Sequence, residues 1–282
     1  MKNILIIANN DRDLGLAMSK ELIEYIEKNG GTARLASDMD NDYEGGIIKD
    51  ELIKDAECCI VLGGDGTMLR AAKALGDRDI PLMGINMGTL GFLTEVEKTN
   101  ATQAVDRLLA DDFRIEERMM MKGSSEGFKP ESTYNVLNDV VITRAGFSRI
   151  IALKIYVNDQ LLDTYEADGV IISTPTGSTG YNLSAGGPIV SPSTRAIIVT
   201  PISPHKLSAK SIVFDAGDRI RVRIEKRNRS QDTEAIVSYD GEGNTDLSYG
   251  DEVLVACSER SVKLIRIQDT NFFGVLRDKI GG

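Results

Sequence analysis

The stretch that most constrains the fold is a glycine-rich turn at residues 62–67, which reads Leu-Gly-Gly-Asp-Gly-Thr. An apolar run at 58–62 precedes it and is typical of a buried strand, and residues 68–75 carry apolar side chains at helical spacing. The turn therefore joins a strand to a helix. Glycines tolerate positive φ and let a ligand approach the backbone, and the free N–H groups that open a helix favour an anion such as phosphate.

One carboxylate, Asp65, stands among these backbone donors. A carboxylate beside bound phosphates repels them unless a cation or a substrate hydroxyl lies between, so the turn suggests phosphoryl-transfer chemistry. The pattern is not the Walker motif, because no Gly-Lys-Ser/Thr follows at the required spacing, and it is not G-x-G-x-x-G. Taken alone, an ordinary tight turn explains these glycines as well as a ligand does.

Strands and helices alternate around this turn through the first 115 residues. Strands are expected at 4–8, 32–36, 58–62 and 81–85, and helices at 13–29, 68–75 and 101–110. Asp13 is expected to cap the first helix, with Leu14 on its buried face. The alternation predicts a parallel, doubly wound sheet that binds ligands at the carboxyl ends of its strands, where a second glycine-containing turn, 86–94, also falls.

After residue 116 the pattern changes to short strands. Pieces of strand length at 150–157, 219–225 and 262–267 alternate with turn signals at 158–159, 215–218 and 240–244, and 123–132 reads as a polar loop. We therefore expect a Rossmann-like doubly wound α/β domain at 1–118 and a mostly β, β-sandwich-like domain at 119–265. The segment 266–282, with a short helix at 271–280, is expected to dock back on the N-terminal domain.

Two stretches of the second domain resist a purely structural interpretation. Residues 167–188 run from a buried strand into about fifteen residues that are mostly Ser, Thr, Gly and Pro, with only Tyr181 and Leu183 as bulky side chains. A long loop between strands is uncommon unless it is functional. We therefore favour a ligand-binding loop over a plain linker. Asn138 and Asp139 interrupt an apolar strand at 134–142 and need polar partners if buried. A bulge cap and a ligand contact explain this pair equally well.

Composition excludes several partners. The formal net charge of −10, the absence of Trp and the aromatic content of 5% argue against nucleic acid and anionic membranes as binding partners.

No apolar run reaches membrane-spanning length, and the N-terminus reads as a strand and not a signal peptide. The cysteines Cys58, Cys59 and Cys257 predict thiols in a reducing cytoplasm, and the single histidine, His205, cannot form a multi-histidine metal site.

Five stretches of the chain resemble, in their order, the motifs of bacterial NAD kinases, the ATP-NAD or inorganic polyphosphate-ATP-NAD kinase family. These stretches are residues 63–67, 86–93, 138–139, 168–169 and 174–188. The resemblance implies ATP-dependent phosphorylation of the adenosine ribose 2′-hydroxyl of NAD to give NADP. It also implies a divalent cation, Mg²⁺ or Mn²⁺, held by the ATP phosphates, and a homo-oligomer, often a homotetramer built as a dimer of dimers. Whether polyphosphate also serves as donor stays open.

The resemblance also implies roles for individual residues. Asp65 would be the general base, Gly66 would approach the dinucleotide with its backbone, and Phe92 would line the adenine side. Asn138 and Asp139 would bind ribose hydroxyls, and Asp168 the nicotinamide carboxamide. The full set of expected substrate contacts is Gly64, Asp65, Gly66, Arg70, Phe92, Asn138, Asp139, Asp168, Thr176, Ser178, Thr179, Gly180, Tyr181, Asn182, Leu183, Ser184, Ser203 and Asp240.

Three positions depart from the family pattern. Asp139 stands where Glu is usual, Gly180 where Ala is common, and Glu166 lies near a position that is often basic. Two rival functions remain at this point. One is a kinase with the same glycine turn that acts on a lipid or a sugar phosphate, and the other is a non-catalytic sensor of NAD or NADP.

Overall fold

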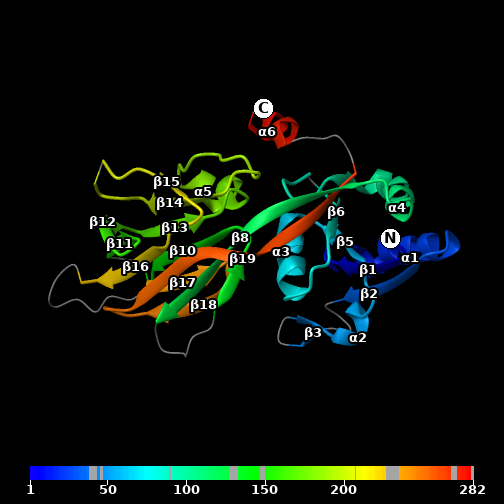
Figure 1. Cartoon of the computed structure of the whole chain (residues 1–282), viewed down its shortest axis with the longest axis horizontal. Helices are drawn as coiled ribbons and strands as arrows, with labels where there is room; N and C mark the ends of the chain where they lie inside the picture. The colour runs from blue at the N-terminus through cyan, green and yellow to red at the C-terminus, as the bar shows by residue number, and fades with distance from the viewer. Residues whose placement is uncertain are drawn as a thin grey trace. The chain divides into compact units, whose positions relative to one another are not determined.

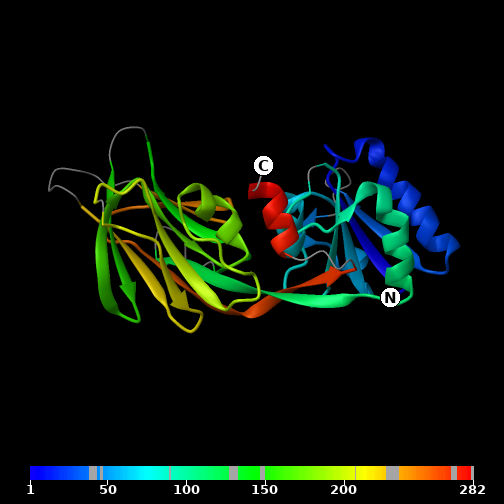
Figure 2. The same cartoon turned by 90° about the horizontal axis from the view of Figure 1, so that it is seen from above.

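The structure is a computed structural model that describes residues 1–37, 43–44, 47–88, 90–126, 133–146, 150–206, 208–226, 235–267 and 272–280 (Figure 1). The chain divides into two compact units, of which unit 1 is Met1–Glu117 with Val262–Gly282 and unit 2 is Arg118–Ser261. Two long strands, β8 (Arg114–Glu126) and β19 (Glu252–Arg266), belong to both units and run side by side (Figure 2). Among the helices of these ranges, none is long and apolar enough to cross a membrane.

Unit 1 is built on a parallel sheet, as the alternating pattern predicted. Its strands lie in the order β2 (Thr32–Ser37), β1 (Asn3–Ala8), β5 (Cys58–Gly63) and β6 (Leu82–Asn86), with the short β7 (Val96–Glu97) and the end of β19 beside β6. All of these pairings are parallel. The central strand β5 is buried along its whole length, as its uninterrupted apolar sequence requires.

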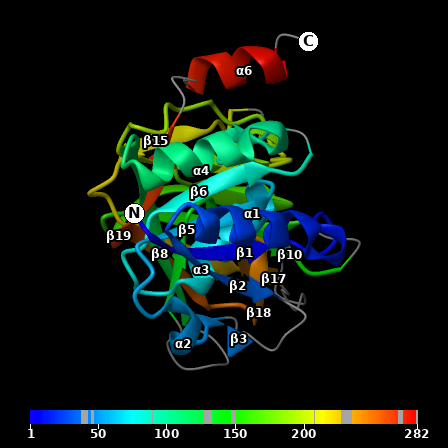
Figure 3. The same ribbon diagram turned by 90° about the vertical axis from the view of Figure 1, so that its right-hand side faces the viewer.

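Helices cover both faces of this sheet. Helices α1 (Ala17–Lys28) and α4 (Ala101–Leu109) lie on one face, and α3 (Asp65–Ala74) lies on the other (Figures 1 and 3). Shorter elements complete the unit: 3-10 turns at Leu14–Leu16 and Lys98–Asn100, the hairpin β3 (Tyr43–Glu44) and β4 (Ile47–Ile48), α2 (Asp50–Ile53), and α6 (Phe272–Ile280). The α/β fold class predicted for this part of the chain is confirmed.

The first helix begins later than predicted. Gly15 and Leu16 take the left-handed conformation, with φ of 66° and 56°, so α1 starts only at Ala17. Asp13 still acts at the helix N-terminus, because the backbone N–H groups of Met18 and Ser19 donate to its carboxylate at 2.8 and 2.9 Å. The expectation that Leu14 faces the core is wrong. Its side chain is 78% exposed, since the left-handed step takes it out of the helical register.

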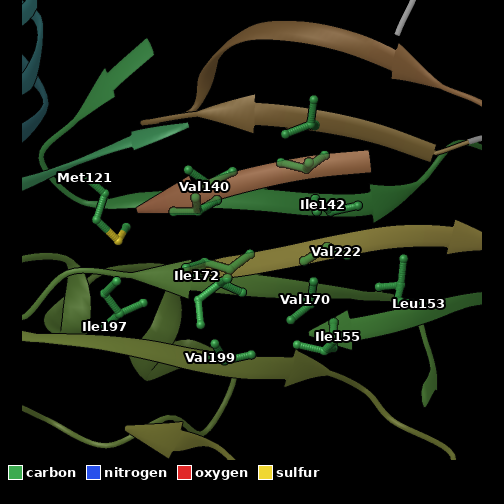
Figure 4. Close-up of a cluster of buried hydrophobic side chains, with 14 of the residues drawn as sticks. Met121, Val140, Ile142, Leu153, Ile155, Val170, Ile172, Ile197, Val199 and Val222 are labelled. Atoms are coloured by element: carbon green, nitrogen blue, oxygen red, sulfur yellow. The ribbon is translucent and has the colours of Figure 1, made fainter. Parts of the chain in front are cut away.

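Unit 2 is a mostly β structure, as predicted, in which two sheets share one core. The antiparallel six-stranded sheet has the order β15 (Ile212–Asp215), β14 (Ala196–Ile202), β13 (Gly169–Ser173), β10 (Asp139–Arg144), β17 (Ala235–Tyr239) and β18 (Glu242–Leu247). The second sheet contains β12 (Gln160–Ala167), β11 (Ile151–Val157), β16 (Ile220–Glu225), β19, β8 and β9 (Tyr134–Val136). Figure 4 shows Val140, Ile172 and Val222 among the apolar side chains of the buried cluster between the strands.

Two loop predictions in unit 2 need correction. Residues 123–126, expected in a polar loop, continue β8, and Gly123 pairs with Tyr134 of β9. A side chain at Gly123 would press on the Tyr239 ring, since its Cβ would lie 2.7 Å from that ring. The rest of that predicted loop, 127–132, lies outside the described residues. The turn expected at 240–244 ends at Gly241, because Asp240 and Gly241 both take positive φ and β18 begins at once.

Candidate active site

Asp65 is the first residue of α3, directly after the end of β5 and Gly64. Its half-buried carboxylate accepts three backbone hydrogen bonds from the second glycine-containing turn. The N–H of Phe92 donates to Oδ2 at 2.8 Å, and those of Leu93 and Thr94 donate to Oδ1 at 3.0 and 3.4 Å. The two glycine turns therefore meet at this carboxylate, through residues 27 to 29 positions apart in the sequence. We call residues 92–94 the amide cradle.

The glycines of the two turns divide into two kinds. A Cβ on Gly91 would overlap the carboxylate of Asp65, and one on Gly63 would overlap the side chain of Thr67. These two glycines are required by packing within unit 1. By contrast, a Cβ on Gly64 or Gly66 would meet nothing within 4 Å. The backbone at Gly64 and Gly66 therefore faces open space, which leaves room for a ligand. An ordinary tight turn would not require glycine at positions where a side chain has room.

Side-chain bonds brace the second turn from within. Asn86 forms a closed pair with Gly88, donating to its carbonyl at 2.6 Å and accepting from its N–H at 3.1 Å. The N–H of Gly91 donates to the hydroxyl of Thr94 at 3.0 Å. Thr89 lies outside the described residues, and the predicted contact Arg70 is an exposed residue of α3.

Phe92 contributes its ring as well as its backbone. The ring lies 6.0 Å from the ring of Phe272, between centroids, and the Lys279 ammonium lies 5.4 Å above it. Both partners belong to α6, so the C-terminal helix packs on the cradle. A role for Phe92 beside adenine was expected from the resemblance, whereas this contact with α6 was not predicted residue by residue.

In unit 2 the Ser/Thr/Gly-rich stretch is folded into two short helices, a 3-10 turn at Gly177–Thr179 and α5 (Tyr181–Ser184). It packs on the interruption between β9 and β10. The hydroxyl of Thr174 donates to the Leu137 carbonyl at 2.6 Å and accepts from the N–H of Gly177 at 3.1 Å. A Cβ on Gly177 would overlap the carbonyl of Asn138. The two stretches that resisted a structural interpretation in the sequence are thus in direct contact.

Two of the predicted contacts, Ser178 and Asn182, are fully buried. The Ser178 hydroxyl donates to the Pro175 carbonyl at 2.6 Å and accepts from the N–H of Val190 at 3.0 Å. The Asn182 amide donates to two backbone carbonyls at 3.0 Å, and its oxygen accepts from Thr200 at 2.7 Å. Their side chains therefore hold the two short helices in shape.

The other predicted residues of this stretch differ in exposure. Thr176 is buried and its hydroxyl accepts a bond of 3.4 Å from the buried Arg118. Thr179, Gly180 and Leu183 are half-buried, and Tyr181 and Ser184 are exposed. Ser203 is also exposed and has a positive φ of 47°.

Asp240 holds the turn that carries the Asn-Asp pair. Its carboxylate accepts the backbone N–H groups of Leu137 and Asn138, both at 2.7 Å, and of Asp139 at 3.0 Å. The side-chain amide of Asn138, a half-buried residue, makes no hydrogen bond with any residue that the structure describes. Asp240 was expected to contact the ligand, and its role in holding the backbone of residues about 100 positions away was not predicted.

Asp139 is a buried carboxyl group with unusual surroundings. It is 7% exposed, and within the described ranges no hydrogen bond reaches its side-chain oxygens. Burial, and secondarily the nearby Asp240 charge, raises the pKa of Asp139 to about 7. A buried acid without a partner is costly, and a ligand hydroxyl could supply the missing donor.

Asp168 has a partner that the sequence did not reveal. Arg144 donates from Nε to its carboxylate at 2.8 Å, and both side chains are half-buried. Arg144 ends β10 and Asp168 directly precedes β13, and these two strands pair with each other, which the sequence does not show.

No cluster of three or more His, Cys, Asp or Glu residues suited to a metal ion occurs among the described residues. A cavity of ≈ 570 Å³ in unit 2, lined by Lys122, Arg219 and Leu254 among others, contains none of the predicted contacts.

The sequence matches two family models, the ATP-NAD kinase N-terminal domain over residues 4–113 and the ATP-NAD kinase C-terminal domain over residues 137–267. The chain belongs to the NAD kinase family. It is 45% identical over 285 residues to the NAD kinase of Lachnoclostridium phytofermentans, covering 100% of this chain and 99% of that protein. It is 42% identical to the NAD kinase of Agathobacter rectalis, again over 100% and 99% of the two chains.

Solved structures of NAD kinases share this fold. Yeast NADH kinase complexed with NADH superposes with a TM-score of 0.87 at 22% identity, over 100% of this chain and 88% of the yeast chain. An NAD kinase from Archaeoglobus fulgidus in complex with ATP gives a TM-score of 0.78 at 26% identity, over 99% and 98%. The NAD kinase fold, an N-terminal α/β part and a C-terminal mostly β part, is therefore that of this chain.

Proposed function

We propose that this NAD kinase family member transfers the γ-phosphoryl group of ATP to the 2′-hydroxyl of the adenosine ribose of NAD, giving NADP. Asp65 acts as the general base. The observation that carries the proposal is the fixed carboxylate of Asp65, held by three backbone N–H groups beside the open backbone of Gly64 and Gly66. The ATP and NADH complexes of the related structures support the two substrates.

The chemistry follows from what these groups offer. A ribose hydroxyl is a poor acid, so a carboxylate that accepts its proton as the bond to phosphorus forms contributes typically ~10²–10⁴-fold to the rate. The remaining acceleration comes from aligning the hydroxyl with the γ-phosphate and from neutralising phosphate charge. The N–H groups at the start of α3 are suited to that second task.

A divalent cation, Mg²⁺ or Mn²⁺, fits this site only as a companion of ATP. The described residues contain no acidic cluster able to hold a metal by themselves, and the Asp65 carboxylate accepts hydrogen bonds from three backbone N–H groups. We propose that the ATP phosphates hold the metal, which neutralises part of their charge when bound. Asp65 remains free of a ligand role and keeps its function toward the hydroxyl.

For the dinucleotide, we propose that unit 2 supplies most of the contacts, in addition to Gly66 and Phe92 of unit 1. Asn138 and Asp139 have side-chain groups that no described residue engages, so they can bind ribose hydroxyls and base edges. Gly180, Tyr181, Leu183 and Ser184 carry the half-buried or exposed surface of the two short helices. Asp168 is oriented by Arg144 and can accept a bond from the nicotinamide carboxamide.

We further propose a homotetramer, a dimer of dimers, in a reducing cytoplasm. The support is the family resemblance together with three free thiols, Cys58, Cys59 and Cys257, of which the first two are buried. Light scattering on the purified protein tests the oligomer. A mass of one or two subunits would contradict it.

The test of the reaction is an assay with NAD, ATP and Mg²⁺ that reads NADP with an NADP-specific dehydrogenase. NADP formation without phosphorylation of a lipid or of fructose phosphate supports the proposal and excludes the rival kinases. Well-folded protein that makes no NADP, also with polyphosphate, NADH and Mn²⁺, would overturn it. Tight NADP binding without transfer under all these conditions would favour the sensor.

A further inference from the structure

The amide cradle that holds Asp65 is itself fixed by the end of β19. Arg266, the last residue of that strand, donates from Nη1 to the Leu93 carbonyl at 3.4 Å. The same guanidinium donates from Nε to the Glu116 carboxylate at 2.6 Å. One planar side chain thus links the cradle to β8, and the link lies within unit 1.

Glu95, the residue after the cradle, also contacts the end of β19 and the residue that follows it. Its Oε1 accepts the backbone N–H of Ile267 at 3.0 Å, and its own N–H donates to the Gly84 carbonyl at 3.1 Å. Glu95 Oε2 lies 3.6 Å from Nη1 of Arg266, and the two side chains are 4% and 13% exposed. A pair this buried is screened little by water, so it fixes the cradle more firmly than a surface pair would.

The geometry of one peptide unit joins this pair to Asp65. The carbonyl of Leu93 and the N–H of Thr94 belong to the same planar peptide and point in opposite directions. Arg266 holds the carbonyl side, while the N–H side donates to Oδ1 of Asp65 at 3.4 Å. If this peptide plane rotates, the N–H turns away from Asp65. The position of Arg266 therefore controls one of the donors that orient the carboxylate.

We propose that Arg266, supported by Glu95, is a positioning residue for phosphoryl transfer that acts through the Leu93–Thr94 peptide on Asp65. This inference rests on the proposed role of Asp65 as general base. It assigns the C-terminal end of β19 a share in the chemistry, although Arg266 and Glu95 take no part in proton transfer. An error of about 1 Å in a reacting group can cost on the order of 10²-fold in rate.

The test compares Arg266→Met with Lys263→Met. Lys263 lies on the same strand and pairs with Asp79 at the surface, away from the cradle, so its substitution controls for loss of a cation from β19. For Arg266→Met we expect kcat to fall ~10- to 100-fold with KM for NAD near the wild-type value. Hydrogen exchange of the Leu93 and Thr94 amides should become faster. Lys263→Met should leave both readouts unchanged.

Several outcomes would overturn the proposal: unchanged kcat and exchange in Arg266→Met, equal changes in Lys263→Met, or a loss confined to KM. If Arg266→Met does not fold, Arg266→Lys replaces it, because one ammonium cannot replace the two-sided contact with Glu116 and the Leu93 carbonyl. If the wild type makes no NADP, the proposed function fails. The exchange comparison then decides the positioning role alone, since it needs no turnover.

Discussion

Replacing Asp65 by Asn tests the base and the cradle together. Asp65 receives two N–H donors on Oδ1 and one on Oδ2. An amide retains a single acceptor oxygen, so at least one backbone N–H of residues 92–94 would face an NH₂ group and lose its acceptor. Leaving such a donor unsatisfied costs about 1–3 kcal/mol. The loss of a proton acceptor should lower kcat by ~10²–10⁴-fold.

The assay separates these two effects. We expect the melting temperature of Asp65→Asn to fall by about 2–12 °C, so turnover is measured at 25 °C, where the variant is folded. NAD affinity, measured by calorimetry, should stay near the wild-type value, because unit 2 supplies most of the proposed dinucleotide contacts. Asp112→Asn, which removes an exposed carboxylate paired with Arg107, is the control. An Asp65→Asn enzyme with near wild-type turnover would refute the assignment of the base.

Four further substitutions follow from the geometry. Gly91→Ala should lower kcat by on the order of 10²-fold and should also lower the melting temperature, because its Cβ would displace the Asp65 carboxylate. Gly64→Ala should leave the melting temperature unchanged, because its Cβ would meet nothing within 4 Å. Equal melting temperatures for the two variants would contradict this reasoning. Gly180→Ala should fold and stay active, since φ there is negative and the new Cβ would lie 3.3 Å from the nearest atom, a carbonyl oxygen that must yield only slightly; a large loss of activity would show that the position needs glycine. The pKa of Asp139 is higher in the folded protein than in the unfolded chain, so between about pH 4 and 7 the folded protein binds one proton that the unfolded chain has lost. The free energy of unfolding therefore falls as pH rises through that window, by up to about 4 kcal/mol. Asp139→Asn should flatten this dependence in urea titrations at pH 5 and 8, and an unchanged slope would refute the burial argument.

Most of the fold of unit 1 follows from local sequence. The apolar run at 58–62 became β5 (Cys58–Gly63), and the periodic segment at 101–110 became α4 (Ala101–Leu109). Both signals depend on side chains that are near in sequence, so periodicity detects them. The misplaced start of α1 has another cause, because a non-glycine residue, Leu16, takes the left-handed conformation, which residue preferences do not predict.

The candidate site was predictable as a set of motifs and not as a network. Asp65 and Asp240 were both identified as acids in turns, yet the sequence does not say which backbone N–H groups they accept. Asp240 holds residues 137–139 from about 100 positions away, and Arg144 meets Asp168 across two strands. Such pairings depend on sheet register. Local patterns carry no information on which distant polar groups a given register brings together.

The order of the chain gives unit 1 a particular assembly history. Its sheet and core include Leu264, Ile265 and Ile267, which leave the ribosome only after the whole of unit 2 has emerged. Until Arg266 has emerged, the amide cradle at residues 92–94 lacks the side chain that links it to Glu116 of β8. A nascent chain can thus complete the β-rich unit before Arg266 reaches the Leu93 carbonyl. In the order of synthesis, this support of the Leu93–Thr94 peptide, which donates to Asp65, is among the last contacts of the molecule to form.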